Sequence, residues 1–285
     1  MDHSLPAAPL LDASRFELVI RRLADSLGHG TDRSIFRGSG VEYEQSRPYQ
    51  AGDPVKTIDW RVTARTGTVH VKEYEAPRRI PVWCLVDTSA SMAVGSQRPT
   101  KYETAVTIAG GLALACLERM RPVGCLGLGG RHLVVQPSLS RLTTLGWLHR
   151  LRRHRLDEPT RLEEATRLLE PLLGERALVI VLSDLQDPSA TARLGRLAQE
   201  HDVCALVLRD PAERGVRSGF LRGREAETGR SITSRGRFVA AAAPARLGAL
   251  ATAGIDGLLI DTDRPYAARL RLFLSRRRPL AGRGT

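Results

Sequence analysis

The sequence predicts an α/β protein whose central sheet is doubly wound and mostly parallel, with one antiparallel edge strand. Short aliphatic runs without polar alternation recur between residues 82 and 261, and amphipathic helical stretches separate most of them. Strands of this kind are typical of parallel sheets that helices cover on both faces. Gly129-Gly130 lies between two of the runs, which indicates a two-residue hairpin and therefore an antiparallel neighbour.

The first expected element is an amphipathic helix over residues 12–27. Its apolar side chains recur at helical spacing and share one face: Phe16, Val19, Ile20, Leu23 and Leu27. From residue 28 to about 79 the chain is polar and rich in Gly and Arg, and its one strand-like stretch is Thr68–Tyr74. We therefore expect a leading helix over 1–28 and a loop/β appendage over 29–80.

The α/β domain is expected over residues 81–278, followed by a tail over 279–285. The expected strands are 82–87, 123–128, 132–136, 177–183, 203–209 and 257–261, and the expected helices are 101–120, 141–152, 161–173, 189–200, 244–253 and 265–278. Residues 210–243 are predicted to be an irregular basic excursion. If the strands take the order 3-2-1-4-5-6, a crevice lies between the carboxyl ends of the first and fourth strands, where Asp87 and Asp184 stand.

The chain is strongly basic, with 43 Lys and Arg against 31 Asp and Glu, a formal net charge of +12. Such a surplus attracts nucleic acid, anionic lipid or an acidic partner. The arginines are spread along 150–155, 209–237 and 264–283 without the interleaved aromatic residues on which bases stack. A nucleic-acid-binding or anion-binding protein is therefore the alternative interpretation, not the leading one.

The four cysteines, Cys84, Cys116, Cys125 and Cys204, lie in apolar runs and form no C-x-x-C pair. They predict buried thiols and suit a reducing compartment, and no spacing indicates zinc. The N-terminal residues lack the pattern of a signal peptide, and no apolar run is long enough to span a bilayer. We expect a cytoplasmic protein.

A set of oxygen ligands follows the predicted strand ends. Asp87, Ser89 and Ser91 alternate in the loop after the first strand, Thr160 precedes a helix, and Asp184 follows the fourth strand. Mg²⁺ prefers oxygen ligands and is usually held by one or two carboxylates. The sequence therefore predicts a site for Mg²⁺ or Mn²⁺. The alternative is that these acids and Thr160 cap the helices that follow them.

At these positions the chain resembles the von Willebrand A superfamily, whose metal-ion-dependent adhesion site joins a D-x-S-x-S loop, a Thr and a later Asp. The resemblance implies that Asp87, Ser89 and Ser91 head the site, with Thr160 and Asp184 binding directly or through water. It also implies that an acidic side chain of a partner completes the coordination, and that binding is the usual outcome.

The appendage carries a second resemblance, through the pattern R-x-Y-x-x-G-D over residues 47–53 and I-D-W over 58–60. It is similar to the bacterial family called domain of unknown function 58, over about residues 30–275. That resemblance implies a partner, a MoxR-type AAA+ ATPase. We expect Trp60 to be an anchoring core residue. The charged side chains of this segment either fasten the appendage to the sheet domain or dock a partner together with Trp60: Arg47, Asp53, Asp59 and Arg65.

Enzymatic functions find little support. The sequence lacks the phosphate loop G-x-x-x-x-G-K-[ST] and the nucleophile motif G-x-S-x-G. A phosphatase of the aspartyl-phosphate kind also uses a strand-end Asp, but its general acid stands two residues later, where this chain has Ser89. A metal-dependent phosphatase is therefore the least favoured alternative. The leading prediction is a non-enzymatic, metal-dependent protein-interaction module.

Overall fold

The computed structural model describes residues 13–28, 43–74, 80–93, 95–131, 133–174, 176–187, 189–214, 219–224, 231–236 and 242–277. The chain divides into two units, one formed by Phe36–Arg79 and the other by Met1–Ile35 together with Ile80–Thr285. We describe each unit by itself.

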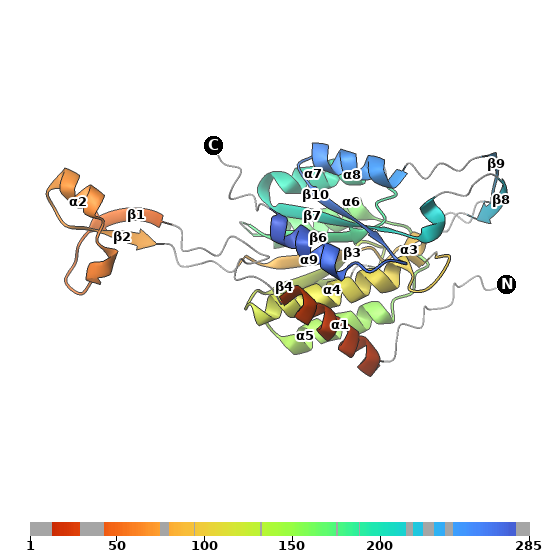
Figure 1. Cartoon of the computed structure of the whole chain (residues 1–285), viewed down its shortest axis with the longest axis horizontal. Helices are drawn as coiled ribbons and strands as arrows, with labels where there is room; N and C mark the ends of the chain where they lie inside the picture. The colour runs from red at the N-terminus through yellow and green to blue at the C-terminus, as the bar shows by residue number, and fades with distance from the viewer. Residues whose placement is uncertain are drawn as a thin grey trace. The chain divides into compact units, whose positions relative to one another are not determined.

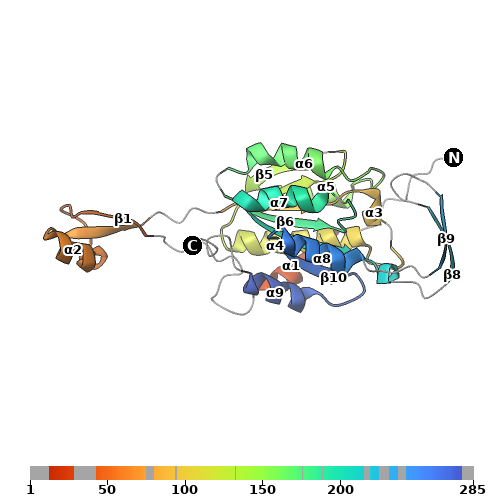
Figure 2. The same cartoon turned by 90° about the horizontal axis from the view of Figure 1, so that it is seen from above.

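The larger unit is built on a six-stranded sheet with the order β10-β7-β6-β3-β4-β5 (Figures 1 and 2). The strands are β3 (Val82–Val86), β4 (Val123–Gly127), β5 (Val134–Ser138), β6 (Leu178–Ser183), β7 (Asp202–Arg209) and β10 (Asp256–Asp261). All neighbours pair in parallel except β4 and β5, which pair antiparallel. In chain order this is 3-2-1-4-5-6, so the predicted sheet, its order and its antiparallel edge are confirmed.

Helices cover both faces of this sheet (Figures 1 and 2). One face carries α6 (Leu162–Leu169), α7 (Ala190–Glu200) and α8 (Ala242–Thr252). The other carries α4 (Lys101–Glu118), α5 (Arg141–Arg152), α1 (Ala13–Gly28) and α9 (Ala267–Arg276). Side chains of β3 fit this double covering, because the whole strand is buried and Trp83 and Leu85 pack in the core that α6 and α7 close.

Helix α4 is apolar on every side because it lies between the sheet and α1. The predicted face of α1 packs on it, with Phe16, Ile20, Leu23 and Leu27 buried. Gly111 permits this close approach, since a Cβ there would lie 2.6 Å from Leu23 Cδ2. The leading helix is therefore part of the core of the larger unit.

The smaller unit holds more regular structure than the sequence predicted. The antiparallel pair β1 (Tyr43–Pro48) and β2 (His70–Tyr74) flanks a 3-10 turn, η1 (Val55–Thr57), and a short helix, α2 (Trp60–Thr66). Only β2 was expected. Asp59 begins α2, because its Oδ1 accepts hydrogen bonds from the backbone N–H groups of Arg61 and Val62.

Two other expectations were wrong. The stretch 210–243 is not wholly irregular, since it contains η3 (Pro211–Arg214) and an antiparallel pair, β8 (Gly219–Arg224) and β9 (Ser231–Gly236). Gly129-Gly130 is not a two-residue turn, because β4 ends at Gly127 and β5 begins at Val134. Gly129 instead forms a bridge with Thr160. No helix among the described residues is long and apolar enough to cross a membrane.

Candidate functional site

The candidate site lies at the carboxyl ends of β3 and β6, which are neighbours in the sheet. Asp87 extends the ladder by donating its N–H to Leu182 O at 2.9 Å. Its Oδ1 accepts the Ser89 N–H at 3.0 Å, and Ser89 Oγ lies 3.0 Å from Ser91 Oγ. The carboxylate and the two hydroxyls of the alternating loop therefore gather at one place, as the spacing predicts. All three side chains are buried.

Asp87 is an acid in an unfavourable environment. It is completely buried, and its Oδ2 accepts a hydrogen bond from Ser183 Oγ at 2.5 Å. Burial, and then the negative charge of Asp184, raise the pKa of Asp87 to about 6, although the hydrogen bonds from Ser183 and Ser89 act in the opposite direction. A positive charge at this place would relieve both unfavourable effects.

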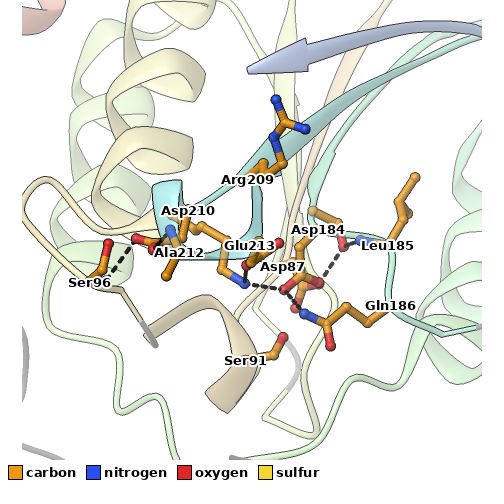
Figure 3. Close-up of polar contacts among 12 residues, drawn as sticks. Asp87, Ser91, Ser96, Asp184, Leu185, Gln186, Arg209, Asp210, Ala212 and Glu213 are labelled. Atoms are coloured by element: carbon orange, nitrogen blue, oxygen red, sulfur yellow. Dashed lines mark hydrogen bonds and ion pairs between the residues drawn. The ribbon is translucent and has the colours of Figure 1, made fainter. Parts of the chain in front are cut away.

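Asp184 follows β6 in a turn that also contains Leu185 and Gln186 (Figure 3). Its Oδ2 accepts hydrogen bonds from Lys101 Nζ at 2.7 Å and from Gln186 Nε2 at 3.0 Å. Its Oδ1 is buried and has no hydrogen-bond partner within the described part of the chain. Leu185 has a φ of 49°, a left-handed conformation that costs a non-glycine residue roughly 1–2 kcal/mol. Such conformations concentrate at functional sites.

Glu158 holds the other side of the Asp87 loop. Its Oε1 accepts from Thr88 Oγ1 at 3.2 Å and lies 2.6 Å from His154 Nε2, and its backbone O accepts the Ala90 N–H at 2.8 Å. Thr88 Oγ1 also accepts the Gly129 N–H at 2.9 Å. Thr88 therefore belongs to this supporting network and not to the row formed by Asp87, Ser89 and Ser91.

Thr160 reaches the same edge through its bridge with Gly129, the residue that also contacts Thr88. The helix-capping interpretation of Thr160 is wrong, because Arg161 is the N-cap of α6 and makes no side-chain cap. Asp184 does not cap α7 either, since the N-cap of that helix is Ser189. For Asp87 the local bond to the Ser89 N–H is compatible with a turn-stabilising role as well as with ligation.

The donor set at this edge mixes carboxylates with hydroxyls. Within the described ranges, no group of three or more His, Cys, Asp or Glu side chains is arranged to hold a metal ion. The oxygens at this edge are of the kind that Mg²⁺ and Mn²⁺ accept, and the unpaired Asp184 Oδ1 together with the destabilised Asp87 carboxylate fits a cation.

Comparison with known proteins adds a family. The family model described as "Protein of unknown function DUF58" matches residues 45–242. This chain belongs to the DUF58 family. It is also 28% identical over 281 residues to uncharacterised proteins of Mycobacterium bovis and of two strains of Mycobacterium tuberculosis, an alignment that covers 92% of this chain and 87% of each relative.

The DUF58 match includes most of the smaller unit, where three of the candidate docking residues have structural contacts. Arg47 forms a two-pronged ion pair with Asp53, with Nη1–Oδ2 and Nη2–Oδ1 distances of 2.8 and 2.9 Å. Asp59 caps α2 and accepts from Ser46 Oγ at 2.8 Å. These contacts lie within residues 43–74, so they hold the smaller unit itself together.

The other two candidate docking residues face solvent. Trp60 is 68% exposed, so the expectation that it is a core anchor was wrong. The reason is its position at the start of α2: Trp60, Arg61, Ala64 and Arg65 form the exposed side of the helix, and Val62 and Thr63 form the inner side. Arg65 has no ion pair with any described residue. Of the five, Trp60 and Arg65 are thus available for contact.

Sequence reasoning missed Lys101, Glu158 and Glu213. Lys101 begins α4 and is buried, and its Nζ joins Asp184 to Glu213 of η3, each at 2.7 Å. Burial lowers the pKa of Lys101, but the charges of Asp184 and Glu213 outweigh this effect and raise it. The one available signal was the position of Lys101 directly after a helix cap, Thr100, next to the predicted crevice.

Proposed function

We propose that this DUF58 protein is a non-enzymatic interaction module that binds a divalent metal ion and uses it to bind a protein partner. Asp87, Ser89 and Ser91 would hold the ion, which is Mg²⁺ or Mn²⁺. Thr160 and Asp184 would contribute directly or through water. The finer fold assignment, a von Willebrand A-like domain, is part of the same proposal. It is supported by the doubly wound sheet and by the position of the Asp87 loop at its first strand.

The observation that carries the proposal is the burial of two acids at neighbouring strand ends without full compensation. Asp87 and Asp184 are both buried, and one oxygen of Asp184 lacks a partner. Buried charges are ordinarily paired or coordinate a metal, because an isolated charge loses its hydration. The hydroxyls of Ser89 and Ser91 stand beside Asp87 and add neutral oxygen ligands.

A bound ion would supply a Lewis-acid position for a ligand from outside. Mg²⁺ takes about six oxygens, and the five candidate side chains do not all bind it directly, so a position is left for the partner. An acidic side chain suits that position, and the basic character of the chain favours its approach. The family resemblance points to a MoxR-type AAA+ ATPase as this partner.

The structure weakens the case for nucleic acid, the second candidate. Several arginines of the basic stretches are engaged in ion pairs: Arg209 and Arg214 with Asp261, and Arg277 with Asp202. Their charges are therefore partly neutralised inside the fold and do not form a free basic row. Phosphate-driven binding also falls steeply with salt and does not need a divalent ion, so the two candidates differ in a measurable way.

Calorimetry with Mg²⁺ and Mn²⁺ tests the metal. The wild type should bind one ion weakly, and Asp87→Ala and Ser89→Ala should each lose binding. Ser96→Ala is the matched control, because Ser96 is exposed and contributes only its backbone N–H to the neighbouring network. Equal binding by the wild type and Asp87→Ala would remove the metal from this loop.

Binding to a purified MoxR-type ATPase tests the partner. The wild type should bind in Mg²⁺ and lose affinity in EDTA at constant ionic strength, and Asp87→Ala should be weak in both. Full affinity of both proteins in EDTA would mean that recognition does not run through the metal. A protein that retains short nucleic acids equally in Mg²⁺ and EDTA, with a steep dependence on salt, would favour the second candidate.

A further inference from the structure

Lys101 is a buried cation fixed directly beside the candidate metal site. Its side chain is 2% exposed, and its Nζ donates to Asp184 Oδ2 and to Glu213 Oε1, both at 2.7 Å. The two carboxylates that it joins are drawn in Figure 3. An ammonium group loses its hydration on burial and is retained only where good partners replace the water. The position of Lys101 is therefore determined by these two acids.

The two acids differ in how firmly they are held. Asp184 is 1% exposed and also accepts from Gln186, whereas the Glu213 side chain is 31% exposed. Glu213 lies on η3, and Asp210 fastens this turn by accepting the N–H groups of Ser96 and Ala212, each at 2.9 Å (Figure 3). Glu213 is thus the outer, replaceable partner of Lys101, and Asp184 is the inner one.

A divalent ion at Asp87 and the ammonium group of Lys101 both need the charge of Asp184. Like charges at close range in a poorly hydrated place repel each other strongly. An ammonium group shared with Glu213 leaves more of the Asp184 charge for the ion than one held by Asp184 alone.

We propose that Lys101 determines the metal affinity of the site by competing with the ion for Asp184, and that Glu213 relieves this competition by holding the ammonium group toward η3. The inference rests on the proposed metal site. It has a regulatory consequence: docking of η3 and binding of the ion support each other, and any event that moves Glu213 away from Lys101 weakens the metal. Thermodynamic linkage makes this coupling reciprocal, so the ion also stabilises η3.

The test is calorimetry with Mn²⁺ at fixed pH and ionic strength on the wild type, Lys101→Met, Lys101→Arg and Glu213→Gln. Lys101→Met should bind about tenfold tighter or more, within the range by which groups outside the ligand set change metal affinity. Lys101→Arg keeps the charge and should stay near the wild type. Glu213→Gln, a change at a partly exposed side chain, should bind more weakly. In the Lys101→Met background Glu213→Gln should have a much smaller effect, because the route through the ammonium group is gone.

Hydrogen exchange gives a second readout, which a purely structural ion pair would not move. Mn²⁺ should increase the protection of the η3 amides in the wild type and leave it unchanged in Lys101→Met. If the wild type binds Mn²⁺ and Lys101→Met binds equally or more weakly, the inference is overturned and the proposed function stands. If Lys101→Met does not fold, an unchanged affinity of Glu213→Gln overturns it equally. If neither the wild type nor any variant binds Mn²⁺, the proposed function fails as well.

Discussion

Replacing Asp87 by Asn should stabilise the metal-free protein at neutral pH, although it removes a charge from the candidate site. Burial, and then the charge of Asp184, raise the pKa of Asp87 from 3.8 to about 6. Each pKa unit corresponds to about 1.4 kcal/mol, so an ionised Asp87 costs the folded state about 3 kcal/mol. The Asn side chain carries no charge and keeps the oxygen that accepts the Ser89 N–H. Allowing about 1 kcal/mol for a poorer bond to Ser183, the net gain is about 2 kcal/mol.

The sign of the pH dependence follows from the raised pKa. Above pH 6 Asp87 is ionised in both states and the full cost is present. As the pH falls from about 6 toward 3.8, the folded protein takes up a proton that the unfolded chain does not bind, and the wild type recovers stability. The advantage of Asp87→Asn should therefore be largest at pH 7.5 and should largely disappear by pH 4.

Urea unfolding in EDTA at pH 7.5 and at pH 4.5 measures this advantage, and thermal unfolding should show a shift of roughly 4–8 °C at the higher pH. Asp261→Asn is a control of opposite sign. Burial raises the pKa of Asp261, but the hydrogen bonds and charges of Arg209 and Arg214 lower it overall, so its loss should destabilise the protein at pH 7.5. An Asp87→Asn variant that is no more stable than the wild type at pH 7.5, or whose advantage does not change with pH, would refute the reasoning.

Three further predictions concern the surroundings of the site, the smaller unit and turnover. Gly129→Ala should cost about 1–3 kcal/mol of stability and weaken metal binding, because its Cβ would lie 2.2 Å from Glu158 Oε1. Gly146→Ala, with nothing within 4 Å of the new Cβ, should be neutral or slightly stabilising in urea unfolding. Trp60→Ala should leave the melting temperature almost unchanged and weaken partner binding; a large loss of stability would return Trp60 to a structural role. Purified protein should hydrolyse neither ATP nor a generic phosphomonoester, and activity lost in Asp87→Ala would revive the phosphatase alternative.

The large α/β unit could be predicted well because its elements have clear periodicity. The helix expected over 141–152 is observed as α5 (Arg141–Arg152), and every strand of the central sheet was expected to within a few residues. Strand order followed from short connections and from the hairpin signal between β4 and β5. The carboxylates after β3 and β6 could then be placed at one edge, since parallel neighbours end together.

The smaller unit was harder because its elements are short and polar. Strand β1 (Tyr43–Pro48) contains Glu, Gln, Ser, Arg and Pro, so it has no alternation to detect. Helix α2 has seven residues, fewer than two full turns beyond its cap, and its start depends on Asp59 alone. The exposed Trp60 illustrates the same limit, because composition predicts that tryptophan is buried and only the helix geometry reveals which side it occupies.

The supporting residues of the site could not be found from local patterns. Lys101 and Glu213 are 112 residues apart, and each would ordinarily be assigned to a solvated helix end or loop. Glu158 lies in a polar stretch before α6, where acids are common for reasons of helix electrostatics. Their roles arise only when the sheet brings three distant loops to one edge.

The costs gathered at this edge bear on whether the site is structural or functional. An ionised Asp87 and a left-handed Leu185 together disfavour the folded state by several kcal/mol, whereas a domain has a total stability of about 5–15 kcal/mol. A purely structural arrangement would be expected to reduce such costs, as happens at Asp261, where arginines lower the pKa of the buried acid. At Asp87 the nearest cation, Lys101, instead binds Asp184 and Glu213. A strand end that keeps one acid uncompensated, with two hydroxyls beside it, is better explained by a cation from outside than by internal packing.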